Sequence, residues 1–259
     1  MRELLNNLYS YRQLLKSNVR KEIRGKYKGS FLGVLWSFVN PLLTTLVYAI
    51  VFPIILKSNE PHYVTFIVIG ILAWTYFTTV IMQGTTTILN NAGIVKKVYF
   101  PREILPISVN TSGAINFLIS CVIIMIFLIF SGIGFSWYLL LLPVIIAIQY
   151  LLQLGIIFIT GAINVYIRDA EYIINFIINM LFYATPILYT SKMFENSAFY
   201  WIFKLNPMAV IIDSYRDIMF YKQVPNIKYL LMVFAVSFIL FYIGYKIFKK
   251  LERKFAEEI

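Results

Sequence analysis

Six long stretches of this chain contain no lysine, arginine, aspartate, glutamate or histidine. Each is close to, or longer than, the roughly 20 apolar residues that an α-helix needs to cross the hydrocarbon core of a membrane. Only helices and closed barrels satisfy their backbone hydrogen bonds there. The sequence therefore predicts an all-α integral membrane protein, one transmembrane domain over residues 1–259, with spans at 31–56, 64–89, 104–130, 137–164, 172–190 and 229–245.

The basic residues predict how the chain is oriented. The net charge is +11, which by itself would allow a nucleic-acid partner. However, most of the 23 lysines and arginines fall in segments that six spans place on one side of the membrane: 1–30, 90–106, 165–171 and 246–259. The positive-inside rule makes this side cytoplasmic, so both termini are expected there. We expect the basic segments to contact anionic membrane lipids and expect no nucleic-acid partner.

Residues 4–28 have the periodicity of an amphipathic helix. One stripe is apolar or aromatic and its neighbour is basic, four residues apart in each case: Tyr11, Leu15, Val19, Ile23 and Tyr27, then Arg12, Lys16, Arg20, Arg24 and Lys28. This pattern predicts a helix in the membrane interface with its basic face towards headgroups or a partner. A simple juxtamembrane anchor is the alternative. Residues 1–30 contain no continuous apolar run, so we expect no cleavable signal peptide.

The loop at residues 91–106 combines apolar and charged side chains. Val95, Val98, Tyr99 and Phe100 are apolar or aromatic, and Lys96, Lys97, Arg102 and Glu103 are charged. Pro101 and Pro106 limit the length of any helix in the loop. A solvated loop has no need of three adjacent apolar residues, so the pattern predicts a short helix that docks into another protein. Alternatively, Tyr99 and Phe100 anchor the loop in the membrane interface.

Residues 191–228 are too apolar for an ordinary external loop and too charged to span the membrane. The pattern predicts two short helices that re-enter the membrane from outside and are joined near Asn206-Pro207. Such backbone is tolerated at membrane depth only when it is buried in protein or lines a cavity. Asp213 and Asp217 flank Arg216, which predicts a local ion network.

Several classes of function are disfavoured by what the sequence lacks. It contains no phosphate-binding Gly-x-x-x-x-Gly-Lys-Ser/Thr motif and no ionisable residue inside a span, which argues against ATP binding and proton-coupled transport. His62 and Cys121 are the only histidine and cysteine, so we expect no catalytic, cofactor or metal residues. An enzyme acting on polyprenyl-linked glycans remains an alternative, with Asp169 and Glu171, or Asp213 and Asp217, as its carboxylates.

Uncharged polar residues enter the spans, among them Gln149, Asn175 and Asn179, and the chain has 19 tyrosines and 22 phenylalanines. Most of these amides are expected to form hydrogen bonds between helices. Some should face a transport pathway, because amides bind hydroxyl groups and aromatic rings stack on sugars without a fixed charge that would trap a long glycan.

Four motifs stand in a fixed order along nearly the whole chain. They are Lys26-Tyr27-Lys28-Gly29-Ser30 with Leu32-Gly33, Leu35-Trp36 and Pro41; Phe100-Pro101-Arg102-Glu103-Ile104-Leu105-Pro106; Asn164-Val165-Tyr166-Ile167-Arg168-Asp169 with Thr185-Pro186-Ile187-Leu188-Tyr189; and Asn206-Pro207 with Tyr215-Arg216. Together they resemble the integral-membrane permeases of type-2 ATP-binding-cassette (ABC) exporters for lipid-linked polysaccharide, of the O-antigen and teichoic-acid kind.

The resemblance implies an amphipathic interface helix, six transmembrane helices and external gate helices between the fifth and sixth spans. It implies a homodimer that binds two copies of a separate ATPase, which holds the ATP and Mg. The coupling helix would map onto about Gly93 to Glu103, which includes Val95, Lys96, Lys97, Val98, Tyr99, Phe100 and Arg102. The gate would map onto about Phe194 to Tyr221, with Asn206, Pro207, Asp213, Tyr215, Arg216 and Asp217.

The function implied by this resemblance is export of an O-antigen or teichoic-acid type polysaccharide across the bacterial inner membrane. Arg20, Lys21 and Arg24 would hold the lipid pyrophosphate near a lateral opening, since guanidinium and ammonium groups bind phosphate oxygens. Arg168 and Asp169 would lie at the coupling side or at the mouth where the lipid enters. A permease of the same architecture for a drug or small lipid is the alternative.

Overall fold

The computed structural model describes residues 2–25, 62–190 and 200–259, and between the first two ranges Leu35, Trp36, Val39, Asn40, Leu42, Leu43, Thr44, Leu46, Val47, Ile50 and Val51. No strand occurs in this part of the chain, which is helical apart from turns. The order is α1 (Arg2–Ser10), α2 (Arg12–Gly25), α4 (Tyr63–Asn90), α5 (Ala92–Val95), α6 (Ile104–Phe130), η2 (Trp137–Leu141), α7 (Leu142–Tyr166), α8 (Ala170–Tyr183), α9 (Tyr200–Leu205), α10 (Pro207–Arg216), η4 (Asp217–Tyr221), α11 (Ile227–Leu251), η5 (Glu252–Lys254) and α12 (Phe255–Glu258).

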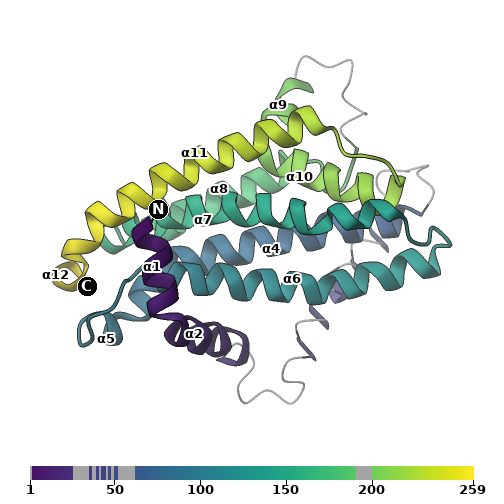
Figure 1. Ribbon diagram of the computed structural model, residues 1–259. Coiled ribbons are helices and arrows are strands. Elements are labelled where there is room, and N and C mark those ends of the chain that lie inside the picture. Colours follow the sequence, from purple (N-terminus) through teal and green to yellow (C-terminus); the bar gives the residue numbers. More distant parts are fainter. Residues whose placement is uncertain are drawn as a thin grey trace.

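Four of the described helical segments are long and apolar enough to cross a membrane: Tyr63–Asn90, Ile104–Phe130, Trp137–Tyr166 and Ile227–Glu258. They contain the residues of four predicted spans: 64–89, 104–130, 137–164 and 229–245. Helices α4, α6, α7 and α11 form the bundle, with α1, α5 and α12 at one end and α9 at the other (Figure 1). The span predicted at 31–56 lies largely outside the described residues.

The fifth predicted span, 172–190, does not continue as a helix to its expected end. Helix α8 stops at Tyr183, and a turn follows in which the Ile187 N–H donates to the Thr185 carbonyl at 2.7 Å. Pro186 explains the stop, because proline has no N–H and disfavours helical backbone at the residue before it. Mean hydropathy does not reveal this break, since residues on both sides of it are apolar. The carbonyls beyond Tyr183 therefore need donors from outside α8.

The closest helix pair in the bundle is α7 with α11. A Cβ atom added to Gly244 would lie 2.4 Å from the Gly155 carbonyl oxygen, and one added to Gly155 would lie 2.6 Å from the Phe241 nitrogen. The two backbones are therefore in direct contact, as small residues allow in membrane helices.

The amphipathic segment predicted at 4–28 consists of two helices, α1 and α2, which meet at Tyr11. Leu4 is buried, and the partly buried Leu8, Tyr11, Leu14 and Leu15 pack against the hydrophobic core. Helix α2 lies against α6. Tyr11 and Leu15 of the predicted apolar stripe thus contact the protein's own bundle, which the sequence pattern alone did not distinguish from contact with lipid. The predicted continuation to residue 28 lies outside the described residues.

The α7–α11 contact predicts that Gly244→Ala lowers the stability of the bundle. The added methyl group has no room, and forcing extra volume into a packed interface costs about 1–3 kcal/mol. Reversible unfolding in mixed micelles would measure this loss. Gly93→Ala is the matched control, because a Cβ atom there meets nothing within 4 Å. Equal unfolding free energies for Gly244→Ala and wild type would contradict the backbone contact.

Candidate functional site

The loop between α4 and α6 presents a small apolar surface. Ile94, Val98 and Tyr99 are exposed, and the exposed fraction of Tyr99 is 91%. Val95 and Phe100 are buried. The Phe100 ring, predicted to belong to the coupling segment together with Tyr99, is held within the protein, and its role in coupling remains a prediction. Sequence reasoning also missed Ile94, whose spacing of four residues from Val98 was the available signal.

Charged and polar groups surround this surface. Lys96 and Lys97 are exposed beside it. At the start of the loop, Lys21 Nζ of α2 donates to Asn91 Oδ1 at 2.8 Å, and Asn91 Nδ2 donates to the Thr87 carbonyl at 2.8 Å. Lys21, predicted to hold a lipid headgroup, thus binds the loop and ties α2 to it.

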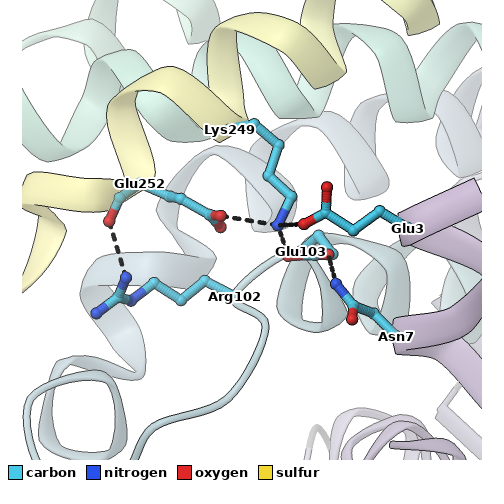
Figure 2. Close-up of polar contacts among 6 residues, drawn as sticks. All are labelled: Glu3, Asn7, Arg102, Glu103, Lys249 and Glu252. Carbon is cyan, nitrogen blue, oxygen red and sulfur yellow. Dashed lines mark hydrogen bonds and ion pairs between the residues drawn. The ribbon is translucent and has the colours of Figure 1, made fainter. Parts of the chain in front are cut away.

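The other end of the loop enters a cluster of polar side chains that we call the polar junction. It contains Glu3 and Asn7 from α1, Arg102 and Glu103 from the loop, Lys249 from the last turn of α11, and Glu252 from η5 directly after it (Figure 2). Lys249 Nζ lies 3.1 Å from Glu103 Oε2, 2.8 Å from Glu252 Oε1 and 3.6 Å from Glu3 Oε1. Asn7 Nδ2 donates to Glu103 Oε1 at 2.9 Å, and Arg102 Nη1 donates to the Glu252 carbonyl at 2.9 Å.

Glu103 is the buried centre of the polar junction, and its side chain is fully shielded from solvent. A buried carboxylate is tolerated only when it is paired and hydrogen-bonded, and here each of its two oxygens has a donor. A cavity of ≈ 600 Å³ lies beside the junction, with Tyr99, Arg102 and Arg253 among its lining residues. Sequence reasoning identified Arg102 and Glu103 but not their partners, because nothing in the local sequence links α1 and α11 to the loop.

The residues predicted to receive the lipid headgroup lie on separate elements. Arg20 is exposed on α2, and Arg24 belongs to the last turn of that helix. Arg168 and Asp169 are exposed in the turn between α7 and α8. That turn is held by Asn164, whose Oδ1 accepts from the Glu171 N–H at 3.2 Å. The predicted roles of these four residues remain predictions.

At the other end of the bundle, Asn206 joins α9 to α10. Its Oδ1 accepts from the Met208 and Ala209 N–H groups at 3.0 and 3.4 Å, and Pro207 occupies the first turn of α10. This is the expected chemistry of a helix start, with a capping side chain before a proline. Asn206 Nδ2 also donates to Thr185 Oγ1 at 2.9 Å, which fastens α10 to the break after α8.

Arg216 supplies donors to the carbonyls that follow the break in the fifth predicted span. Its Nη1 donates to the Pro186 carbonyl and its Nη2 to the Ile187 carbonyl, both at 2.6 Å. The arginine is buried. Unpaired carbonyls within a membrane span are costly, so this pair of hydrogen bonds compensates for the helix break.

The positive charge of Arg216 is itself compensated. Asp213 Oδ1 lies 3.6 Å from Nη1, and the guanidinium lies over the Phe66 ring, 3.6 Å from its centroid. Gly70 leaves the necessary space, because a Cβ atom there would lie 2.6 Å from Arg216 Nη2. The predicted ion network around Arg216 is thus present for Asp213, whereas Asp217 Oδ1 accepts from Gln223 Nε2 at 2.5 Å.

Tyr215 connects α10 to the centre of the bundle. Its hydroxyl donates to Gln149 Oε1 at 2.9 Å, and Gln149 Nε2 donates to the Ala73 carbonyl at 3.1 Å. A buried amide of α7 thereby links α10 and α4, as expected for most of the polar residues in the spans. Among the described residues, no group of three or more His, Cys, Asp or Glu side chains is placed to hold a metal ion.

The family of this chain follows from comparison with known proteins. Residues 13–220 match the model of the family described as ABC-2 type transporter. The chain belongs to this family. It is also 35% identical to the O-antigen export system permease protein RfbA of Myxococcus xanthus over the full length of both chains. Two RfbA permeases of Klebsiella pneumoniae are 35% and 34% identical to it, over 94% of each chain.

Membership of the ABC-2 family confirms the resemblance drawn from the four motifs. With several helices long enough to span a membrane, the chain is a multi-pass membrane permease. The family also implies a transport subunit, with ATP hydrolysis on a separate subunit of the ABC transporter.

The hydrogen bonds of Arg216 predict that Arg216→Met destabilises the protein. Each buried carbonyl left without a donor costs about 1–3 kcal/mol, and both acceptors are affected. The free energy of unfolding in mixed micelles is the measurement. Arg168→Met is the control, since Arg168 is exposed and its loss should change stability by less than about 0.5 kcal/mol. If both variants unfolded like wild type, the role assigned to Arg216 would be wrong.

Proposed function

We propose that this chain is the permease of an ATP-driven exporter that moves a lipid-linked polysaccharide across the bacterial inner membrane. The observation that carries the proposal is the similarity to O-antigen export permeases over the whole chain. Two copies would form the transmembrane pathway and bind two copies of a separate ATPase, which holds ATP and Mg. Both termini would be cytoplasmic, as the distribution of basic residues predicts.

The surface formed by Ile94, Val98 and Tyr99 is the proposed docking site for the ATPase. These side chains are exposed at the end of the bundle where α1 and α12 lie (Figure 1). Buried Val95 and Phe100 hold the loop against the bundle, so the exposed surface is presented by a fixed framework. A firmly held apolar projection suits insertion into a cleft on a partner, because little conformational entropy is lost on binding.

The exposed face of helix α8 supports the proposal that the substrate is a polysaccharide. Asn175 and Asn179 are exposed on it, and Asn179 Nδ2 donates to Asn175 Oδ1 at 3.2 Å. The exposed rings of Tyr172 and Tyr183 lie on the same side of the helix, one turn before Asn175 and one turn after Asn179. Amides turned towards hydrocarbon are unfavourable, so this face needs a more polar neighbour than lipid tails. A hydroxyl-rich glycan, bound by amides and stacked on tyrosine rings, meets that need without fixed charge.

The remaining predicted sites take the following roles in this proposal. Helices α9 and α10, with Asn206, Pro207, Asp213, Tyr215, Arg216 and Asp217, form the external gate. Arg20 and Arg24 bind the pyrophosphate of the lipid carrier, and Arg168 and Asp169 lie at the mouth where the lipid enters.

The docking proposal predicts that Val98→Asp combined with Tyr99→Asp separates the permease from its ATPase. Both side chains are exposed, so the fold should survive while the apolar contact is lost. Co-purification through a tag on the permease, followed by measurement of ATP hydrolysis, tests this. Tyr99→Phe is the matched control and should retain the ATPase. Phe100 is left unchanged because it is buried. Undiminished ATPase binding by the double variant would refute docking at this surface.

The pathway proposal predicts that Asn175→Leu combined with Asn179→Leu lowers export at least about tenfold but leaves the ATPase bound. The change removes two amides that would bind glycan hydroxyls and keeps the helix apolar and similar in size. Surface polysaccharide in cells lacking the native permease is the measurement, with Met180→Leu on the same helix as control. Loss of the dimer in light scattering would instead assign this face to contact between two copies. Normal export would exclude a role in the pathway.

A further inference from the structure

One ammonium group in the polar junction joins three segments that are distant in the sequence. Lys249 of α11 contacts Glu3 of α1, Glu103 at the end of the coupling loop, and Glu252 just beyond α11 (Figure 2). We propose that Lys249 is a positioning residue for energy coupling. It fastens the loop that docks the ATPase to the last transmembrane helix, so that displacement of the loop carries α11 with it. This inference rests on the proposed function and adds a residue to its mechanism.

The burial of Glu103 makes this connection difficult to break. Its carboxylate is fully buried, and one of its two donors is Lys249. Separating the loop from α11 would leave that charge in the interior without a cation, which is strongly unfavourable. The Lys249 side chain, by contrast, is 22% exposed, so the junction lies at the edge of the bundle. Loop and helix end are therefore expected to move as one body.

A second set of contacts fastens the same helix end. Two backbone carbonyls where α11 ends receive donors from side chains of other elements. Arg102 Nη1 donates to the Glu252 carbonyl and the Tyr166 hydroxyl donates to the Leu251 carbonyl, both at 2.9 Å. Arg102 comes from the coupling loop and Tyr166 from α7. The loop, α7 and α11 thus share one attachment point.

The contacts of α7 and α11 extend from this point towards the other end of the bundle. Helix α11 continues from Leu251 back to Ile227 without interruption, and the Gly155–Gly244 contact joins it to α7 backbone to backbone. From α7, Gln149 accepts the hydrogen bond of Tyr215 in α10. A displacement at Lys249 therefore has a continuous set of packed contacts leading to the proposed external gate.

The neighbouring lysines of α11 do not share this environment. Lys250 is exposed, and the exposed Lys246 lies over the Tyr242 ring, 4.5 Å from its centroid. Lys250→Met removes the same charge one residue away from Lys249 on the same helix. It is therefore a matched control for Lys249→Met.

The first experiment compares these two variants for coupling. Each is expressed with the ATPase in cells lacking the native permease, and surface polysaccharide is measured alongside ATP hydrolysis by the purified complex in nanodiscs. Lys249→Met should assemble and hydrolyse ATP within about twofold of wild type while export falls at least about tenfold. Lys250→Met should retain both. The double variant Glu103→Gln with Lys249→Met removes both charges, so it leaves no buried carboxylate without a cation; it should assemble and hydrolyse ATP like wild type while export stays low.

Two outcomes would overturn the proposal. One is export by Lys249→Met that matches wild type for the same ATP hydrolysis. The other is a parallel loss of folded complex, hydrolysis and export in Lys249→Met and also in the double variant Glu103→Gln with Lys249→Met, which would make Lys249 merely structural.

Hydrogen exchange in the isolated permease tests the junction independently of transport. In nanodiscs without ATPase, Lys249→Met should speed amide exchange in residues 99–106 about tenfold, and Lys250→Met should not. Equal exchange rates in the two variants would show that Lys249 does not fasten the loop to α11, and would overturn the proposal. A wild-type chain that neither binds an ATPase nor exports polysaccharide would refute the proposed function, whereas the exchange result would still decide the junction.

Discussion

In an apolar medium every backbone carbonyl and N–H group needs a partner within the protein, and this requirement governs both ends of the molecule. Four of the described helical segments are long and apolar enough to cross a membrane, and they meet this requirement without a break. The fifth predicted span does not, because Pro186 ends its helix early. Arg216 then donates to the Pro186 and Ile187 carbonyls, and its own charge is compensated by Asp213 and the Phe66 ring. A broken span and a buried arginine are each unfavourable alone, but together they fix α10 against the bundle.

The same principle operates around a buried charge at the opposite end. Glu103 is enclosed by protein, so its two oxygens require the donors that Asn7 and Lys249 provide. The consequence is that α1, the coupling loop and α11 meet at one point (Figure 2). With Phe100 buried beside this point, the loop is held firmly enough to present Tyr99 outward. The stability of the loop and the exposure of its proposed docking surface therefore depend on adjacent residues of one short segment.

The long apolar helices were predictable because a membrane helix is specified by the length of a run without charge, a property that needs no knowledge of neighbours. The residues predicted at 64–89, 104–130 and 229–245 lie in long helices for this reason. The start of α10 was also readable, since Asn206-Pro207 is a local capping signal. The end of α8 was not predicted, because the span was delimited by hydropathy, which does not register Pro186. The donor that compensates for the break comes from Arg216, 30 residues after Pro186. The burial of Phe100 was not predicted, because composition identifies an apolar segment but not which of its side chains face inward.

By itself, the sequence determined that this chain is a helical membrane protein and, through its ordered motifs, which transporter family it belongs to. These properties follow from local composition and motif order, which are present in the chain before it folds. Only the tertiary structure decided that Lys21 binds the loop, that Glu103 is buried, and that Lys249 is its cation. Those pairings join residues as much as 146 positions apart. They depend on how the helices pack, which no local pattern of residues encodes.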